Sequence, residues 1–405
     1  MPPSRFSVAI VALSAASALA LAGCASTGQA GDGATPKAGK VAQVKVTLAA
    51  GGDGDTCSLD TTSVPAGPVT FTVKNESATG ITEIELLSQQ RIIGEKENLA
   101  PGLKPVSFTL TLGGGTYQLS CPGATKDLQK FTVIGTSAKA TGSIQSILKQ
   151  GTAGYATYVT GDVNSMVTAV ANLKTAIDAG DLEQAKAEYA MARPFYERIE
   201  SDVAGFVLPG FKATDNSGNL DYLIDMRQSN LDPAAGWHGF HAIERDLYQA
   251  GAITDATKQY AAELQTNVGK LDDLVKKLTY KPEDLANGAA GLLEEVQSSK
   301  IKGEEEAFSH LDLVDFAADI EGAQQAFAFL KPGLSKIDPS LTEQVTKQFG
   351  NVQSLLDGYK DSSVPGGYVL YTAELRASDA NKLSQAVQAL QDPLSRIAEK
   401  VASAQ

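Results

Sequence analysis

The sequence contains few of the residues that most often build catalytic and metal sites. Its 405 residues include three histidines, three cysteines, four methionines and one tryptophan. Residues 43–135 contain neither histidine nor methionine. A blue-copper centre needs two histidines and a cysteine, usually with an axial methionine, so this segment cannot hold one.

Basic residues are also scarce relative to acidic ones. The chain has 34 Lys and Arg against 47 Asp and Glu, which gives a net charge of −13. Residues 1–23 carry one basic residue, Arg5, and no acid, so removing them changes the charge from −13 to −14. Such an acidic surface argues against nucleic acid as a partner and attracts cations. The length predicts two or three domains with their own buried cores.

Long apolar runs are confined to the N-terminus. Arg5 precedes the run FSVAIVALSAASALALAG, and Leu21–Cys24 then matches a bacterial lipobox. The run is short and alanine-rich for a permanent membrane span. It predicts a lipoprotein signal peptide at residues 1–23, acylation of Cys24 and a flexible tether at residues 24–42. Ordinary secretion with a chance cysteine is the alternative. An acylated protein would be exported and anchored to the outer face of the cytoplasmic membrane.

Residues 43–135 have the composition of a small β domain. Segments such as QVKVTLA, PVTFTVKN and VSFTLTL are short, rich in Val, Thr and Phe, and several alternate apolar with polar residues. Six or seven such segments, separated by Pro, Gly or Asn, predict a β-sandwich. Cys57 and Cys121 lie in this region. In an exported protein, two such cysteines favour a disulfide over a pair of thiolate ligands.

After a linker at residues 136–145, the pattern changes to that of helices. Apolar residues recur at spacings of three and four, and AGDLEQAK predicts the end of one helix followed by an Asp N-cap. The pattern continues to the C-terminus. Residues 146–405 are therefore expected to form two four-helix bundles packed together. The predicted fold class is multidomain, β followed by all-α.

Two of the three histidines lie in the stretch GWHGFHAIERDLY. His241 and Glu244 are one helical turn apart and can share a ligand, and imidazole with carboxylate suits iron, zinc or copper. A histidine bonded to a neighbouring carboxylate within a core is the alternative. The zinc-protease pattern His-Glu-x-x-His is absent, because Gly239 follows His238 and Ala242 follows His241.

Two further acidic pairs share this spacing of one helical turn. They are Glu197 with Glu200, and Asp312 with Asp315, the second pair lying beside His310 and the run Glu304–Glu306. Any single pair of this kind is common on a solvated helix face. Together with His241 and Glu244 they favour a metal site, and oxygen-rich ligands would suit a hard cation such as Fe(III).

Several of these motifs resemble those of a known family. GFHAIE resembles the Gly-x-His-x-x-Glu signature of imelysin-like proteins. Three longer stretches are similar to the EfeO type within the imelysin-like family: AGDLEQAKAEYAMARPFYERIE, GLLEEVQSSKIKGEEEAFSHLDLVDFAADIEGAQ and IIGEKENLAPG. The resemblance covers residues 43–403. It implies a cupredoxin-like β-sandwich followed by an imelysin-like double four-helix bundle.

The resemblance also implies a function and a site. It implies an extracytoplasmic iron-binding component of an elemental iron importer, which passes ferrous or ferric iron to a permease and works with a haem-containing Dyp-type peroxidase. The implied metal ligands in the helical domain are Glu197, Glu200, Asp225 and Asp312, with Asp315 as second choice to Asp312. His241 and Glu244 match the signature pair, as ligands or as the residues that orient them.

In the β domain, Cys57, Glu83 and Cys121 match positions proposed for metal in relatives. Leu119 stands where relatives often have a methionine, which weighs against copper there.

Other functions remain open from the sequence. A ferroxidase would need two irons about 3.5–4 Å apart with bridging carboxylates, and the chain has enough acids for it. A metallopeptidase is the weaker enzymatic alternative. A metal-dependent polysaccharide-binding protein is a third reading, although the negative charge opposes a polyanion unless a metal bridges the two. No catalytic residues are assigned.

Overall fold

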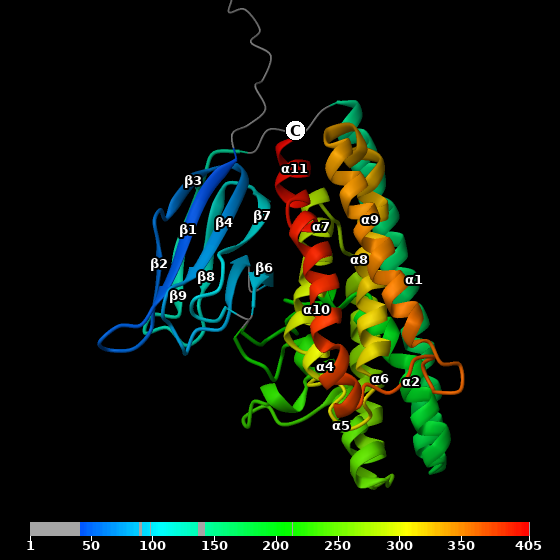
Figure 1. Cartoon of the computed structure of the whole chain (residues 1–405). Coiled ribbons are helices and arrows are strands. Elements are labelled where there is room, and N and C mark those ends of the chain that lie inside the picture. The colour runs from blue at the N-terminus through cyan, green and yellow to red at the C-terminus, as the bar shows by residue number, and fades with distance from the viewer. Residues whose placement is uncertain (1–40, 89–90, 98, 137–141, 213, 405) are drawn as a thin grey trace, which may run out of the picture. The chain divides into compact units, whose positions relative to one another are not determined.

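A computed structural model describes residues 41–404, except for residues 89–90, 98, 137–141 and 213. The predicted signal peptide, Cys24 and nearly all of the predicted tether lie outside the described residues. Strands occupy Ala42 to Ile134 and helices occupy Ser143 to Ser403, so the predicted order, a β domain followed by a helical domain, is confirmed (Figure 1). In the part of the chain that is described, no helix is both long and apolar enough to cross a membrane.

The β domain consists of two sheets. The four-stranded sheet has the order β2 (Thr56–Leu59), β1 (Ala42–Ala49), β4 (Gly67–Asn75), β7 (Val106–Leu112). The five-stranded sheet has the order β3 (Ser63–Pro65), β9 (Leu128–Ile134), β8 (Gly115–Ser120), β5 (Ile84–Ser88), β6 (Arg91–Lys96). The pairs β1–β4 and β3–β9 are parallel, and the other neighbouring strands are antiparallel.

Alternating side chains build the core of this sandwich. In β1, Val44, Val46 and Leu48 are buried while the intervening residues are more exposed, because successive side chains of a strand point to opposite faces. Phe71 of β4 stacks on Phe108 at 5.1 Å and meets Phe131 of the other sheet at 5.2 Å. The three rings therefore join the two sheets. The cupredoxin-like character of the sandwich stays a prediction.

A disulfide links Cys57 of β2 to Cys121, which directly follows β8. Strands β2 and β8 belong to different sheets, and the two cysteines are 64 residues apart in the sequence. The disulfide that the sequence favoured is therefore present, and it joins the sheets covalently. In this oxidation state neither cysteine offers a thiolate to a metal.

The helical domain is built from long helices joined by short ones. The long helices are α1 (Ser143–Ala179), α2 (Leu182–Glu197), α6 (Asp255–Val275), α7 (Pro282–Ser298), α8 (Asp312–Ile337), α9 (Pro339–Leu356) and α10 (Ala373–Leu394). The short helices are α3 (Glu200–Val203), α4 (Leu220–Asp225), α5 (Gly239–Glu244) and α11 (Ile397–Ser403). The described residues also form the short helical turns η1 (Gln228–Asn230), η2 (Arg245–Ala250), η3 (Lys300–Lys302) and η4 (Asp357–Tyr359).

The long helices pack in two groups that share α8. Helix α1 packs against α2, α6 and α8, and α8 also packs against α7 and α9, with α10 against both α7 and α9. The helix boundary predicted from AGDLEQAK is confirmed, because Gly180 ends α1 in the left-handed region at φ 73° and the Asp181 side chain accepts a hydrogen bond from the Gln184 amide. Because α8 contacts both groups, acidic residues on its first turns reach the centre of the domain.

Removing the disulfide is expected to weaken the β domain selectively. Replacing both Cys57 and Cys121 by Ala should lower the free energy of unfolding by about 2–4 kcal/mol, because the crosslink closes a long loop. Thermal unfolding of the purified protein without reductant measures the effect. Reduction of the wild type is the matched control, since it opens the same crosslink and should lower the transition by a similar amount. An unchanged transition of the β domain would contradict the expectation.

Candidate metal centre

The core of the helical domain contains an unusual concentration of buried acids. Among the residues that the structure describes, the acids with buried side chains around this centre come from four helices and the α7–α8 connection; they are Glu197, Asp225, Glu244, Glu305, Glu306, Asp312, Asp315 and Asp319. Glu200 of α3 adds a partly buried carboxyl group. Ionised carboxyl groups are costly to bury unless they meet cations or take up protons.

Close approach of two short helices brings the first group of residues together. Gly239 begins α5 at φ 77°, in the left-handed region, and a Cβ there would lie 2.0 Å from the Ile224 carbonyl oxygen of α4. Only glycine therefore allows α5 to pack so closely against α4. The contact places His241 of α5 beside Asp225 at the end of α4, which explains why the Gly-x-His-x-x-Glu signature has a glycine at this position.

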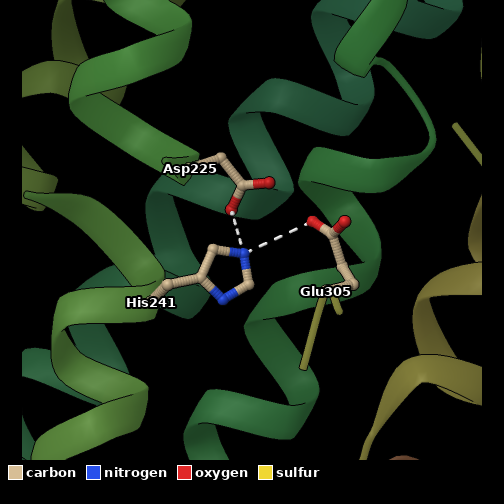
Figure 2. Close-up of side chains that lie close together, drawn as sticks. All are labelled: Asp225, His241 and Glu305. Carbon is tan, nitrogen blue, oxygen red and sulfur yellow. Dashed lines mark ion pairs between the residues drawn. The ribbon is translucent and has the colours of Figure 1, made fainter. Parts of the chain in front are cut away.

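His241 lies between two carboxyl groups. Its Nε2 atom is 3.6 Å from Oδ1 of Asp225 and 3.3 Å from Oε1 of Glu305 (Figure 2). Nε2 and Oε1 of Glu305 have no hydrogen-bond partner in the described part of the chain. One nitrogen and two oxygens thus converge with ligand atoms within 4.8 Å of one another.

Glu244 orients the ring of His241. Its Oε2 atom is 3.1 Å from Nδ1 of the histidine, and its Oε1 atom accepts hydrogen bonds of 2.8 Å from the amides of Phe308 and Ser309. Both oxygens of Glu244 are therefore in use. A carboxylate on one ring nitrogen that directs the other nitrogen to a ligand is common around metal-binding histidines. The geometry favours Nε2 as the ligand atom and Glu244 as its support.

A second group contains Glu197, Glu200 and Asp319, whose ligand atoms also lie within 4.8 Å of one another. The ammonium of Lys300 lies among them: Nζ is 2.9 Å from Oε2 of Glu197, 3.5 Å from Oε2 of Glu200 and 3.4 Å from Oδ2 of Asp319. This group therefore has a permanent cation at its centre. At the His241 group the fixed cation is Arg193, which pairs with Oδ1 of Asp225 and lies 3.6 Å from Oε1 of Glu305.

Arg193 of α2 connects the acids of the two groups. Its guanidinium forms ion pairs with Glu197, Asp225, Glu306 and Asp315, and its side chain is fully buried. A planar guanidinium with five donors is suited to several carboxylates at once. At the edge of the cluster, NH1 of Arg227 lies 2.6 Å from Oε2 of Glu305 and leaves Oε1 directed at His241.

A third group, His241, Glu244 and Glu306, is largely satisfied by protein donors. Oε1 of Glu306 accepts a hydrogen bond of 2.8 Å from the Tyr189 hydroxyl, and Oε2 accepts one from the Ser309 hydroxyl. Since both oxygens of Glu244 also have partners, this group has less capacity for an ion than the group of Asp225, His241 and Glu305.

The buried acids hold protons to a higher pH than usual. Burial raises the pKa of Asp225 and of Asp312 to about 7, and burial together with Glu244 raises that of Glu306 to about 8. Burial works against protonation of His241, but Asp225, Glu244 and Glu305 raise its pKa well above the ordinary value. Protons thus balance negative charge that a bound cation would otherwise balance.

The structure brings the predicted residues into one region but gives them different surroundings. Asp225 and His241 share the first group, whereas Glu197 and Glu200 face Lys300. Asp315 faces Arg193, and Asp312 accepts a hydrogen bond from the Glu306 amide. Their roles as metal ligands stay predictions.

Sequence reasoning missed Glu305, Glu306 and Asp319 as site residues. Asp319 lies one turn after Asp315, so its position on the same face of α8 was available from spacing alone. Glu305 and Glu306 belong to the acidic run before His310, which is not helical and has no spacing rule. Arg193 and Lys300 gave no signal, because basic residues at such positions are usually exposed.

The second predicted site, in the β domain, lacks free thiolates. Cys57 and Cys121 are joined, and burial raises the pKa of Glu83. Glu85 pairs with Glu95 across neighbouring strands, and burial with the charge of Glu83 raises the pKa of Glu85 to about 7. Metal binding by Cys57, Glu83 and Cys121 stays a prediction and would require the reduced protein.

Comparison with known proteins identifies the family. The model of the imelysin family matches residues 151–397, more than half of the chain. The chain belongs to the imelysin family. The chain is also 34% identical over 365 residues to the "Iron uptake system component EfeO" of Escherichia coli K12, and equally to the proteins of that name from Shigella flexneri and Shigella sonnei.

These matches cover 89% of this chain and 92% of each relative. A match of this extent cannot be confined to the helical domain, so the chain is an imelysin-family member of the EfeO type. This confirms the resemblance drawn from GFHAIE and the other motifs.

The packing role of Gly239 can be tested by substitution. Gly239→Ala should lower the free energy of unfolding by more than about 2 kcal/mol, because the added Cβ clashes with the backbone of α4 and alanine also disfavours the left-handed conformation. Gly251→Ala is the matched control, since Gly251 has φ 63° and no atom within 4 Å of an added Cβ. Denaturant unfolding of both variants gives the comparison, and equal losses would show that close approach at Gly239 does not matter.

The raised pKa values predict how stability depends on pH. Between about pH 5 and about pH 8, the folded protein binds protons at Asp225, Asp312 and Glu306 that the unfolded chain releases. The stability of the metal-free protein should therefore fall as the pH rises through this range. Calorimetric melting at several pH values measures it. A bound cation should flatten the dependence, and a metal-free protein that gains stability across the range would contradict the expectation.

Proposed function

We propose that this protein is the extracytoplasmic iron-binding component of an elemental iron uptake system, and that it takes iron at Asp225, His241 and Glu305. The observation that carries the proposal is Nε2 of His241, which is buried between two carboxyl groups and has no hydrogen-bond partner among the described residues. One imidazole with two carboxylates is a donor set that suits iron. The named function of the EfeO relatives supports the same cargo.

The protein holds each of these donors in place before iron arrives. Glu244 bonds Nδ1 of His241, Arg193 pairs with Asp225, and Arg227 pairs with Glu305. Iron at Nε2 would replace the proton that this imidazole carries in the metal-free protein. Iron binding is favourable because a multivalent cation replaces protons among the buried carboxyl groups. Binding is therefore expected to release protons.

The remaining parts of the proposal concern place and partners. The N-terminal sequence supports export and a lipid anchor at Cys24, which would keep the protein at the outer face of the cytoplasmic membrane. The EfeO resemblance supports transfer of the iron to a permease, with a haem-containing Dyp-type peroxidase as the other partner. Zinc and copper suit an imidazole and carboxylates as well, so competition among these metals measures the selectivity for iron.

Substitutions at the histidine test the proposed site. His241→Ala should abolish high-affinity iron binding, and Glu244→Gln should weaken it by about 10- to 100-fold, because the ring loses its support. Anaerobic titration of the purified protein with ferrous iron measures both effects. His238→Ala is the control, since Nδ1 of His238 pairs with Glu263 at 2.9 Å and the residue is not part of the cluster. Binding by His241→Ala that equals the wild type would contradict the proposed site.

A further inference from the structure

Lys300 occupies a position where an ion would be expected. It lies on η3, in the connection between α7 and α8, and its side chain is fully buried. Besides Glu197, Glu200 and Asp319, Nζ has a fourth acidic neighbour, Oε2 of Glu305, at 3.7 Å. Oxygens from four carboxyl groups thus surround one ammonium, much as they would surround a hard cation.

Glu305 links this position to the proposed iron site. Its Oε1 atom is 3.3 Å from Nε2 of His241, and its Oε2 atom, which pairs with Arg227 at 2.6 Å, lies 3.7 Å from Nζ of Lys300. One carboxyl group therefore spans two cation positions. In two-metal centres a bridging carboxylate holds ions about 3.5–4 Å apart. The arrangement has the form of such a centre with an ammonium in the second place.

We propose that Lys300 permanently fills the second cation position and thereby limits the centre to one iron ion. This inference rests on the proposed function of the His241 site. A second ion would have to expel a buried ammonium from four carboxyl groups, which would leave that charge uncompensated in the interior. Glu197 and Glu200 then serve as the partners of Lys300, while iron binds at Asp225, His241 and Glu305.

Metal stoichiometry tests the role of Lys300. Full-length protein is loaded anaerobically with ferrous iron, passed through a desalting column and analysed for metal per chain. The wild type should retain one ion, and Lys300→Met should retain two, because an unbranched apolar side chain of similar length removes the ammonium. Lys302→Met is the matched control: Lys302 lies on the same short helix but is exposed, so this variant should retain one ion.

A second variant keeps the test decisive if Lys300→Met does not fold. Lys300→Gln removes the charge and leaves an amide that can hydrogen-bond with the surrounding carboxyl groups, so it should also retain two ions. Lys300→Arg keeps a cation at this position and should retain one ion, as the wild type does.

The outcomes separate the two proposals. Two ions in the wild type, or one ion in folded Lys300→Met or folded Lys300→Gln, would each overturn the inference about Lys300 while leaving iron binding intact. A wild type that retains no iron would instead overturn the proposed function. One ion in the wild type and in Lys300→Arg, with two in Lys300→Met or Lys300→Gln, would support both.

Discussion

More carboxyl groups are buried in the helical domain than its fixed cations can neutralise, and the arrangement of the centre follows from this excess. Arg193 pairs with carboxyl groups from α2, α4, the α7–α8 connection and α8, so one guanidinium ties together segments far apart in the sequence. Lys300 neutralises the neighbouring group. The charge that remains is balanced by the protons that the raised pKa values retain, and a cation that entered would replace those protons.

The connection between α7 and α8 carries much of this arrangement without being a regular helix. It supplies Lys300, Glu305 and Glu306, and its backbone amides at Phe308 and Ser309 bind Glu244. Near its end, His310 has φ 61°, a left-handed conformation that residues other than glycine seldom adopt. Strained backbone persists where surrounding contacts hold it. Here, the amides held by Glu244 couple the shape of the connection to the orientation of His241.

Parts of the molecule with a repeating pattern were predictable from sequence, and parts without one were not. The alternation in Val44, Val46 and Leu48 and the N-cap at Asp181 follow local rules, and both are as expected. His241 with Glu244 was found from its helical spacing. The separate roles of the two residues, with Nε2 of His241 open to a ligand and Glu244 bonded to Nδ1, could not be predicted, because helical spacing does not show which ring nitrogen a carboxylate contacts. Glu305 and Lys300 lie in an irregular segment whose course depends on tertiary contacts.

The number of cations at the centre decides what chemistry the site can support. A ferroxidase of the di-iron type needs two ions joined by a bridging carboxylate, and Glu305 has the position for such a bridge. With the Lys300 ammonium in the second place, such a bridge would join an ion to a fixed charge that accepts no electrons. A single ion held by one imidazole and two carboxylates fits a carrier, which must bind its cargo and later release it. The same fixed charge would repel the ion and help its release, so one lysine would favour transport over oxidation.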